Sequence, residues 1–262
     1  MLELAAYGAR KRLKGALALA VGLSAFSAMY AAFFPSLTGN LDLGSYVEAL
    51  PPAFVEAFGL RAFNTIEGFL ATELYQFAWV ILLGLYLAYS GASLISGDVE
   101  SGRMDVLLSL PVSRARLVAE QYLSLVPGIL LVNAVVAAVT WVATRVIGYP
   151  VGTADLAVVH LLSLPYLFAC AAVGLAFGVL ADRESVAQRA AIATVFGLFL
   201  LESVVTNTDY AWAGAVAPMR YFDPTAILVD GAYDLAGAAI LVGATLVLVA
   251  ASQLHFRRKD VN

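Results

Sequence analysis

Six long apolar segments decide what this chain can fold into. Each approaches the roughly 20 apolar residues that a helix needs to cross a hydrocarbon core about 30 Å thick. The chain as a whole is 61% hydrophobic and 13% charged, whereas soluble globular domains carry roughly 25% charged residues. The sequence therefore predicts an all-α, multi-pass membrane protein with one domain over residues 1–262. The six transmembrane helices are expected at residues 16–34, 74–95, 123–147, 156–181, 190–205 and 235–254.

The basic residues predict how these helices are oriented. Most of the 15 Lys and Arg residues lie in the N-terminal flank, in the segment 96–122, in the turn after residue 181 and in the C-terminal tail. Basic loops remain on the cytoplasmic side of a membrane. We therefore expect both termini in the cytoplasm, as an even number of spans requires, with the protein in the cell membrane.

Several kinds of chemistry have no support in the sequence. It contains no G-x-x-x-x-G-K-[ST] phosphate loop and no H-E-x-x-H motif, and its one cysteine is Cys170. With only His160 and His255 as imidazole ligands, a zinc site is not expected. We expect no catalytic residue, cofactor, metal or nucleic acid on this chain, whose partner is the lipid bilayer. Energy for any transport would come from another subunit or from an ion.

Shorter features are expected outside the spans. Residues 1–15 suit either an amphipathic helix at the membrane surface or a basic flank that fixes orientation. Pro35 is expected to end the first span. A short amphipathic helix is expected within residues 48–60, and further short helices after Asn207, where Pro218 and Pro224 interrupt the chain.

The segment 96–122, between the second and third spans, is the most charged passage between apolar runs, and we interpret it as a docking segment. Its Glu100-Ser-Gly102 followed by Leu-Leu-Ser-Leu-Pro-Val-Ser-Arg at 107–114 resembles the inner loop of ATP-binding-cassette permeases of the type-2 exporter class. Residues 48–59 and 219–231 resemble passages of the branch that includes the nitrous-oxide-reductase maturation permease. The pattern departs at Arg103-Met104, where Thr-Leu is usual, and at Glu120-Gln121, where a Lys is common.

The resemblance implies a permease that pairs with a second copy or a paralogue. Its loop would form a coupling helix seated in a separate cytoplasmic ATPase subunit, which would hold ATP and Mg²⁺. Leu107, Leu108 and Leu110 would fill an apolar cleft. Ser113 would cap a second helix, and Glu100 and Arg114 would make charged contacts at the rim. The expected interface residues are Glu100, Gly102, Arg103, Leu107, Leu108, Pro111, Ser113 and Arg114.

Four polar residues within the spans are either pathway or packing residues: Tyr86, Tyr89, His160 and Glu202. An ionisable residue inside a membrane is a functional candidate, although a lone histidine also suits a hydrogen-bonded packing role. Glu202 lies near the outer end of its span, where a solvated carboxylate is an equal alternative. The translocation path is expected between protomers, along spans 1, 2 and 5. Two other functions fit the sequence, an ion-coupled secondary carrier and a membrane scaffold that recruits an assembly factor.

Overall fold

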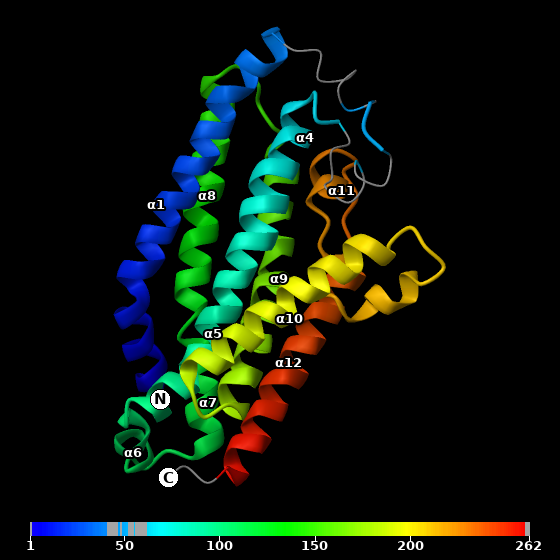
Figure 1. Ribbon diagram of the computed structural model, residues 1–262. Helices are drawn as coiled ribbons and strands as arrows, with labels where there is room; N and C mark the ends of the chain where they lie inside the picture. The colour runs from blue at the N-terminus through cyan, green and yellow to red at the C-terminus, as the bar shows by residue number, and fades with distance from the viewer. Residues whose placement is uncertain (1, 41–46, 48, 52–54, 56–61, 260–262) are drawn as a thin grey trace.

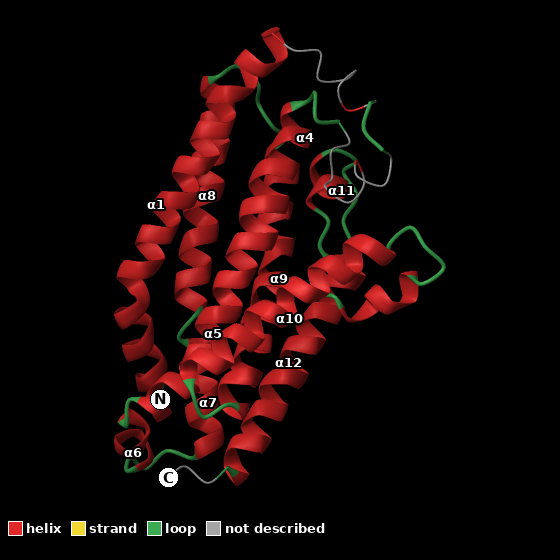
Figure 2. Ribbon diagram, viewed as in Figure 1, coloured by secondary structure: helices red, strands yellow, loops and turns green. Residues whose placement is uncertain are grey.

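The protein is helical throughout the part of the chain that the structure describes. The computed structural model describes residues 2–40, 47, 49–51, 55 and 62–259, and all regular elements in these ranges are helices (Figure 2). Within them, six helical stretches are long and apolar enough to cross a membrane. These stretches are Glu3–Thr38, Ile66–Glu100, Arg114–Val146, Thr153–Leu180, Glu184–Val205 and Leu235–Arg258. The prediction of an all-α protein with six membrane-spanning helices is confirmed.

The first helix, α1 (Glu3–Asn40), is continuous from the N-terminal flank through the first apolar segment. The prediction that Pro35 ends this helix is wrong, because Pro35 lies inside it. Proline removes one helix hydrogen bond and its ring crowds the carbonyl four residues earlier, that of Ala31, yet the helix continues to Asn40. The Ser36 hydroxyl donates to the Phe33 carbonyl at 2.8 Å, and the Thr38 hydroxyl donates to the Phe34 carbonyl at 3.2 Å. The short helix expected within residues 48–60 lies almost entirely outside the described residues.

The second span is longer than expected and contains a wide helical stretch. It consists of α4 (Ile66–Leu70), η1 (Ala71–Leu83) and α5 (Gly84–Glu100), which follow one another without a break. The run begins at Ile66 rather than residue 74, because Thr65 caps it by accepting a hydrogen bond from the Gly68 N–H. The η1 stretch is a π-helix, a form that usually occurs as a single turn.

The third span is divided, and short helices precede it. After α5 come α6 (Arg103–Leu108) and α7 (Arg114–Leu123), and then α8 (Val126–Val146) after a break at Ser124 and Leu125. Figure 1 shows α6 and α7 at the same end of the molecule as both termini. A short helix therefore lies between the second and third spans, as predicted.

Helices α9 (Thr153–Leu180), α10 (Glu184–Val205) and α12 (Leu235–Arg258) complete the bundle. Between α10 and α12 lie three short helices, as expected from the prolines: η2 (Ala211–Val216), η3 (Pro218–Tyr221) and α11 (Pro224–Leu228). The Asp223 carboxylate caps α11 by accepting from the Thr225 and Ala226 N–H groups. The Asp234 carboxylate caps α12 in the same way, accepting from the Gly237 N–H at 2.8 Å.

Helices α5 and α9 pack closely at the centre of the bundle. Gly174 and Gly178, four residues apart on α9, lie against the backbone of Ala88 and Ala92 on α5. A Cβ atom at Gly174 would overlap the Ala88 carbonyl oxygen, and one at Gly91 would overlap the Ala171 carbonyl oxygen. Small residues at this spacing let two membrane helices approach at backbone distance. The stripe thus brings the second and fourth spans together.

This contact leads to a stability prediction. Gly174→Leu should reduce the free energy of unfolding by about 1–3 kcal/mol, the usual cost of overpacking, because the new side chain meets backbone that cannot move aside. Thermal unfolding of the protein in detergent measures the effect. Gly243→Leu is the matched control, since no atom lies within 4 Å of a Cβ built there. Equal melting temperatures for the two variants would contradict the close contact.

Candidate functional site

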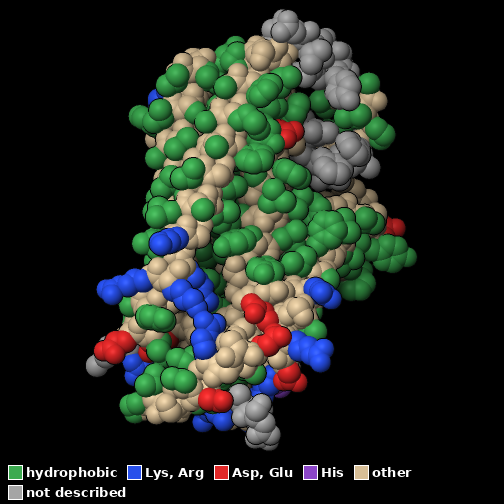
Figure 3. All heavy atoms as spheres, turned by 60° about the vertical axis from the view of Figure 1, so that its left-hand side comes forward, with side chains coloured by type: hydrophobic (Ala, Val, Ile, Leu, Met, Phe, Trp, Pro, Cys, Tyr) green, Lys and Arg blue, Asp and Glu red, His purple; other side chains and the backbone are tan. Residues whose placement is uncertain are grey.

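Charged side chains gather at the end of the molecule that carries α6, α7 and both termini. On the face shown in Figure 3, Lys, Arg, Asp and Glu side chains cluster at this end, while hydrophobic side chains cover most of the rest. This end also contains the segment 96–122, for which the sequence predicts docking. The candidate functional site is therefore built from α6, α7 and the helix ends that contact them.

Two residue choices shape the docking segment. Gly102 precedes α6 with φ of 70°, in the left-handed region that favours glycine. At the start of α7, the Ser113 hydroxyl accepts a hydrogen bond from the Arg116 N–H at 3.3 Å, so the prediction that Ser113 caps a second helix is confirmed. The chain thus turns sharply on both sides of α6.

The apolar side chains of the segment divide between the core and the surface. Met104 is buried, and Leu107 and Leu108 are half-buried against the core. Val106 and Leu110 are 67% and 41% exposed, and Pro111 is also exposed. We call Val106, Leu110 and Pro111 the apolar docking face. Val106 was not among the expected interface residues, and its exposure was not evident from the sequence pattern, because α6 ends at Leu108, before Leu110.

Glu120 of α7 holds the beginning of α1. One carboxylate oxygen accepts from the Leu4 N–H at 3.0 Å and the Ala5 N–H at 3.3 Å, while the other accepts from the Arg116 Nε at 2.6 Å. The side chain is almost fully buried. A carboxylate at a helix N-terminus satisfies donors that have no partner within the helix. Glu120 therefore links the docking segment to the first span.

Two further carboxylates connect the end of α5 with its neighbours. Asp98 accepts from the Gln121 Nε2 at 2.5 Å and forms an ion pair with Arg103 at 2.8 Å, joining α5 to α7 and α6. Glu100 accepts from the Glu184 N–H at 2.7 Å, at the first residue of α10. The sequence assigned Glu100 and Arg103 to contacts with a partner, whereas in the structure their charged groups have partners within the chain.

Arg114 connects the docking segment with the C-terminal end of α12. Its guanidinium donates to the Lys259 carbonyl and lies 5.9 Å from the centre of the Phe256 ring. The Lys259 ammonium in turn donates to the Val179 carbonyl at 2.9 Å and pairs with Asp182 at 2.9 Å. The hydrogen bond and charge of Lys259 lower the pKa of the Asp182 carboxyl below its usual value. The adjacent ends of α7, α9 and α12 are thereby linked.

The predicted intramembrane candidates make no hydrogen bond or ion pair with this cluster among the described residues. His160 is buried between the Tyr75 hydroxyl, 3.0 Å from its Nε2, and the Asn133 Oδ1, 3.2 Å from its Nδ1. Both ring nitrogens thus have partners, as expected of a packing residue. Tyr86 and Tyr89 are each 42% exposed on α5.

Glu202 is buried rather than facing solvent at the outer end of its span. Its carboxylate accepts from the Thr206 hydroxyl at 3.0 Å and lies 3.6 Å from the Arg220 Nη1, on the short helix η3. Gly214 of η2 covers it closely, since a Cβ there would overlap the carboxylate. Glu202 therefore holds the segment between α10 and α12 against the end of α10.

The fold and the charged end together define a multi-pass helical membrane protein. The model of a family described as "ABC-2 family transporter protein" matches residues 10–261. The chain therefore belongs to the ABC-2 family of membrane transporter proteins, whose members are membrane components of ATP-binding-cassette transporters. A comparison with curated proteins gave no match.

The position of Glu120 yields a second prediction. Glu120→Ala should reduce the free energy of unfolding by about 1–3 kcal/mol, because Leu4, Ala5 and Arg116 lose a charged acceptor. Amide hydrogen exchange at residues 4–8 should accelerate as the first turn of α1 frays. Glu3→Ala is the control, since Glu3 is exposed on the same turn. Unchanged exchange at residues 4–8 in Glu120→Ala would show that α7 does not hold α1.

Proposed function

We propose that this chain is the permease subunit of an ATP-driven exporter, in which α6 docks on a separate cytoplasmic ATPase subunit. The ATPase binds ATP and Mg²⁺, and the permease moves in response and has no catalytic residue of its own. Membership of the ABC-2 family supports the permease role. The exporter activity, the ATPase and the pairing with a second copy or a paralogue belong to the proposal.

One observation carries the proposal: the docking segment combines an exposed apolar face with bonds to several membrane helices. Val106 and Leu110 are exposed. Glu120 accepts a hydrogen bond from the first turn of α1, and Arg114 donates one to Lys259, the residue after α12. Glu100, at the same end of the molecule, accepts a hydrogen bond from the first residue of α10. A protein that pushes on the apolar docking face therefore acts on three spans at once. Such a lever is what coupling to a moving ATPase requires.

The charge distribution supports a cytoplasmic position for this end. Lys11 and Arg12 line a cavity with Arg103 of α6, and Arg114 and Arg116 belong to α7. Basic residues stay on the cytoplasmic side of cell membranes. With this orientation, both termini are cytoplasmic and the short helices between α10 and α12 face outward. The proposed path runs between two copies along α1, α5 and α10, where Tyr86 and Tyr89 of α5 are exposed.

The ion-coupled carrier has less support. Such carriers place charged residues or broken helices at the middle of the membrane. His160 has hydrogen-bond partners on both ring nitrogens, and Glu202 is held by Arg220 and Thr206. These contacts favour packing roles for the two residues. The third possible function is a scaffold that transports nothing. ATP hydrolysis that responds to a transported compound would distinguish an exporter from such a scaffold.

The apolar docking face gives a third prediction. In the double variant Val106→Asp with Leu110→Asp, the amount of ATPase that co-purifies with the tagged permease should fall at least tenfold, because two carboxylates would enter an apolar contact. Affinity purification from the native cell in mild detergent, followed by mass spectrometry, measures this. The protein should stay folded, since both side chains point to solvent.

Val186→Asp is the matched control for this experiment. Val186 is 52% exposed and lies in the first turn of α10, at the same end of the molecule but outside α6. It should retain the ATPase at the level of the unchanged protein. If a phosphate-loop ATPase is absent from preparations of the folded, unchanged permease, the exporter assignment fails. If the ATPase binds the double variant normally, docking occurs elsewhere.

A further inference from the structure

Two cavities lie beside α1 at the charged end of the molecule. The larger, of about 270 Å³, is lined by apolar residues such as Val106 and Leu107 together with the polar residues Lys11, Arg12, Asp98, Arg103 and Gln121. The smaller, of about 100 Å³, is lined mostly by leucine and other apolar residues of α1, η1, α5, α8 and α9. Arg12 lines both cavities, so its side chain stands where they meet.

The larger cavity carries an excess of positive charge. Lys11, Arg12 and Arg103 face it together with one carboxylate, Asp98. That carboxylate is already engaged by Arg103 at 2.8 Å and by the Gln121 amide at 2.5 Å. Within the part of the chain that the structure describes, Lys11 and Arg12 form no ion pair, and Arg12 has one hydrogen bond, to the Ser124 hydroxyl at 3.4 Å. Asp98 is the counter-charge for Lys11 and Arg12 as well, so one carboxylate faces three cations, and this excess of positive charge favours binding of an anion.

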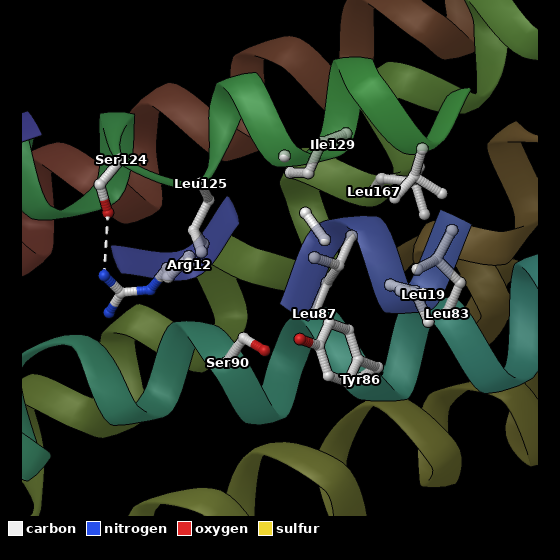
Figure 4. A pocket seen from close by; sticks show the side chains of 13 residues that line it. Arg12, Leu19, Leu83, Tyr86, Leu87, Ser90, Ser124, Leu125, Ile129 and Leu167 are labelled. Atoms are coloured by element: carbon white, nitrogen blue, oxygen red, sulfur yellow. Dashed lines mark hydrogen bonds between the residues drawn. The ribbon is translucent and has the colours of Figure 1, made fainter. Parts of the chain in front are cut away.

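The smaller cavity extends from this charge into apolar surroundings. Figure 4 shows the Arg12 guanidinium and Ser124 towards one end, and Leu19, Leu83 and Leu167 towards the other. Tyr86 and Ser90 of α5 lie on one side between the two ends. The cavity therefore has a cationic end and an apolar end, which match the two parts of an amphiphilic molecule.

The smaller cavity also reaches the surface that would face the membrane. Tyr86, which lines it, is 42% exposed. Beside it, α1 packs along α8 and makes few contacts with α5 (Figure 1). A molecule dissolved in the lipid leaflet could thus enter between α1 and α5 without crossing water.

We propose that the two cavities form one binding site for an anionic amphiphile. Its phosphate or carboxylate headgroup pairs with Lys11 and Arg12, and its hydrocarbon chain lies among the leucines of α1, η1 and α9. Basic pockets between membrane helices at the cytoplasmic side bind acidic lipid headgroups by this chemistry. Arg103 belongs to α6, so the headgroup also lies beside the proposed docking helix. The binding site itself does not depend on the proposed exporter activity.

The test uses the full chain purified in detergent and titrated with three probes: dihexanoyl phosphatidylglycerol, dihexanoyl phosphatidylcholine and inorganic phosphate. Native mass spectrometry counts bound molecules and gives affinities. We expect phosphatidylglycerol to bind at least tenfold more tightly than phosphatidylcholine, and Arg12→Gln to remove this preference. Arg12→Lys should keep it. Arg10→Gln is the matched control, because Arg10 is an exposed cation of the same helix outside both cavities.

A second variant separates the amphiphile from a small free anion. Ser90→Phe fills the smaller cavity and should weaken phosphatidylglycerol at least tenfold while leaving inorganic phosphate unchanged. Equal binding of phosphatidylglycerol and phosphatidylcholine to the unchanged protein would overturn the proposal, and this comparison needs no variant to fold. Inorganic phosphate that binds as tightly as phosphatidylglycerol, with no effect of Ser90→Phe, would overturn the amphiphile in favour of a small-anion site.

Discussion

The close approach of α5 and α9 is the contact on which the rest of the bundle depends. Lipid is as apolar as leucine, so apolar side chains alone give membrane helices little reason to associate. Here Gly174 and Gly178 let α9 meet the backbone of α5. The remaining helices pack around this pair, with α10 and α12 against α9 and the α1–α8 pair at the other side. The position of α5 in turn sets where α6 begins.

At the charged end, polar bonds take over from apolar packing. Glu120, Glu100 and Arg114 each connect the docking segment to a different span, through α1, α10 and the residue after α12. Bonds between charged groups and backbone are stronger than those between neutral groups. A rigid connection of this kind transmits a displacement, whereas a solvated loop would absorb it. The same end leaves Lys11 and Arg12 without ion pairs among the described residues, which gives it a place for an anionic ligand.

Much of the fold followed from the sequence, and the errors have physical causes. Apolar length identified the six spans, and the resemblance to type-2 exporter permeases placed a short helix between the second and third. The prediction failed at Pro35, because the loss of one backbone hydrogen bond there does not end the helix. It began the second span too late, since Glu67 and Glu73 lower the apolar character of a turn that Thr65 nevertheless caps. The Gly174 and Gly178 stripe was visible as a spacing but had no partner until α5 was placed beside it.

By itself, the sequence determined the class of protein, because a chain this apolar has to satisfy its backbone within membrane helices. It also placed the segment 96–122 outside the membrane, since charges between two apolar spans remain at the membrane surface. Only the tertiary structure decided what each residue there contacts. Glu100 and Arg114 bond other helices, Val106 is exposed, and Arg12 stands between two cavities. These outcomes depend on residues more than 80 positions apart meeting in space, and spacing along the chain carries no record of such contacts.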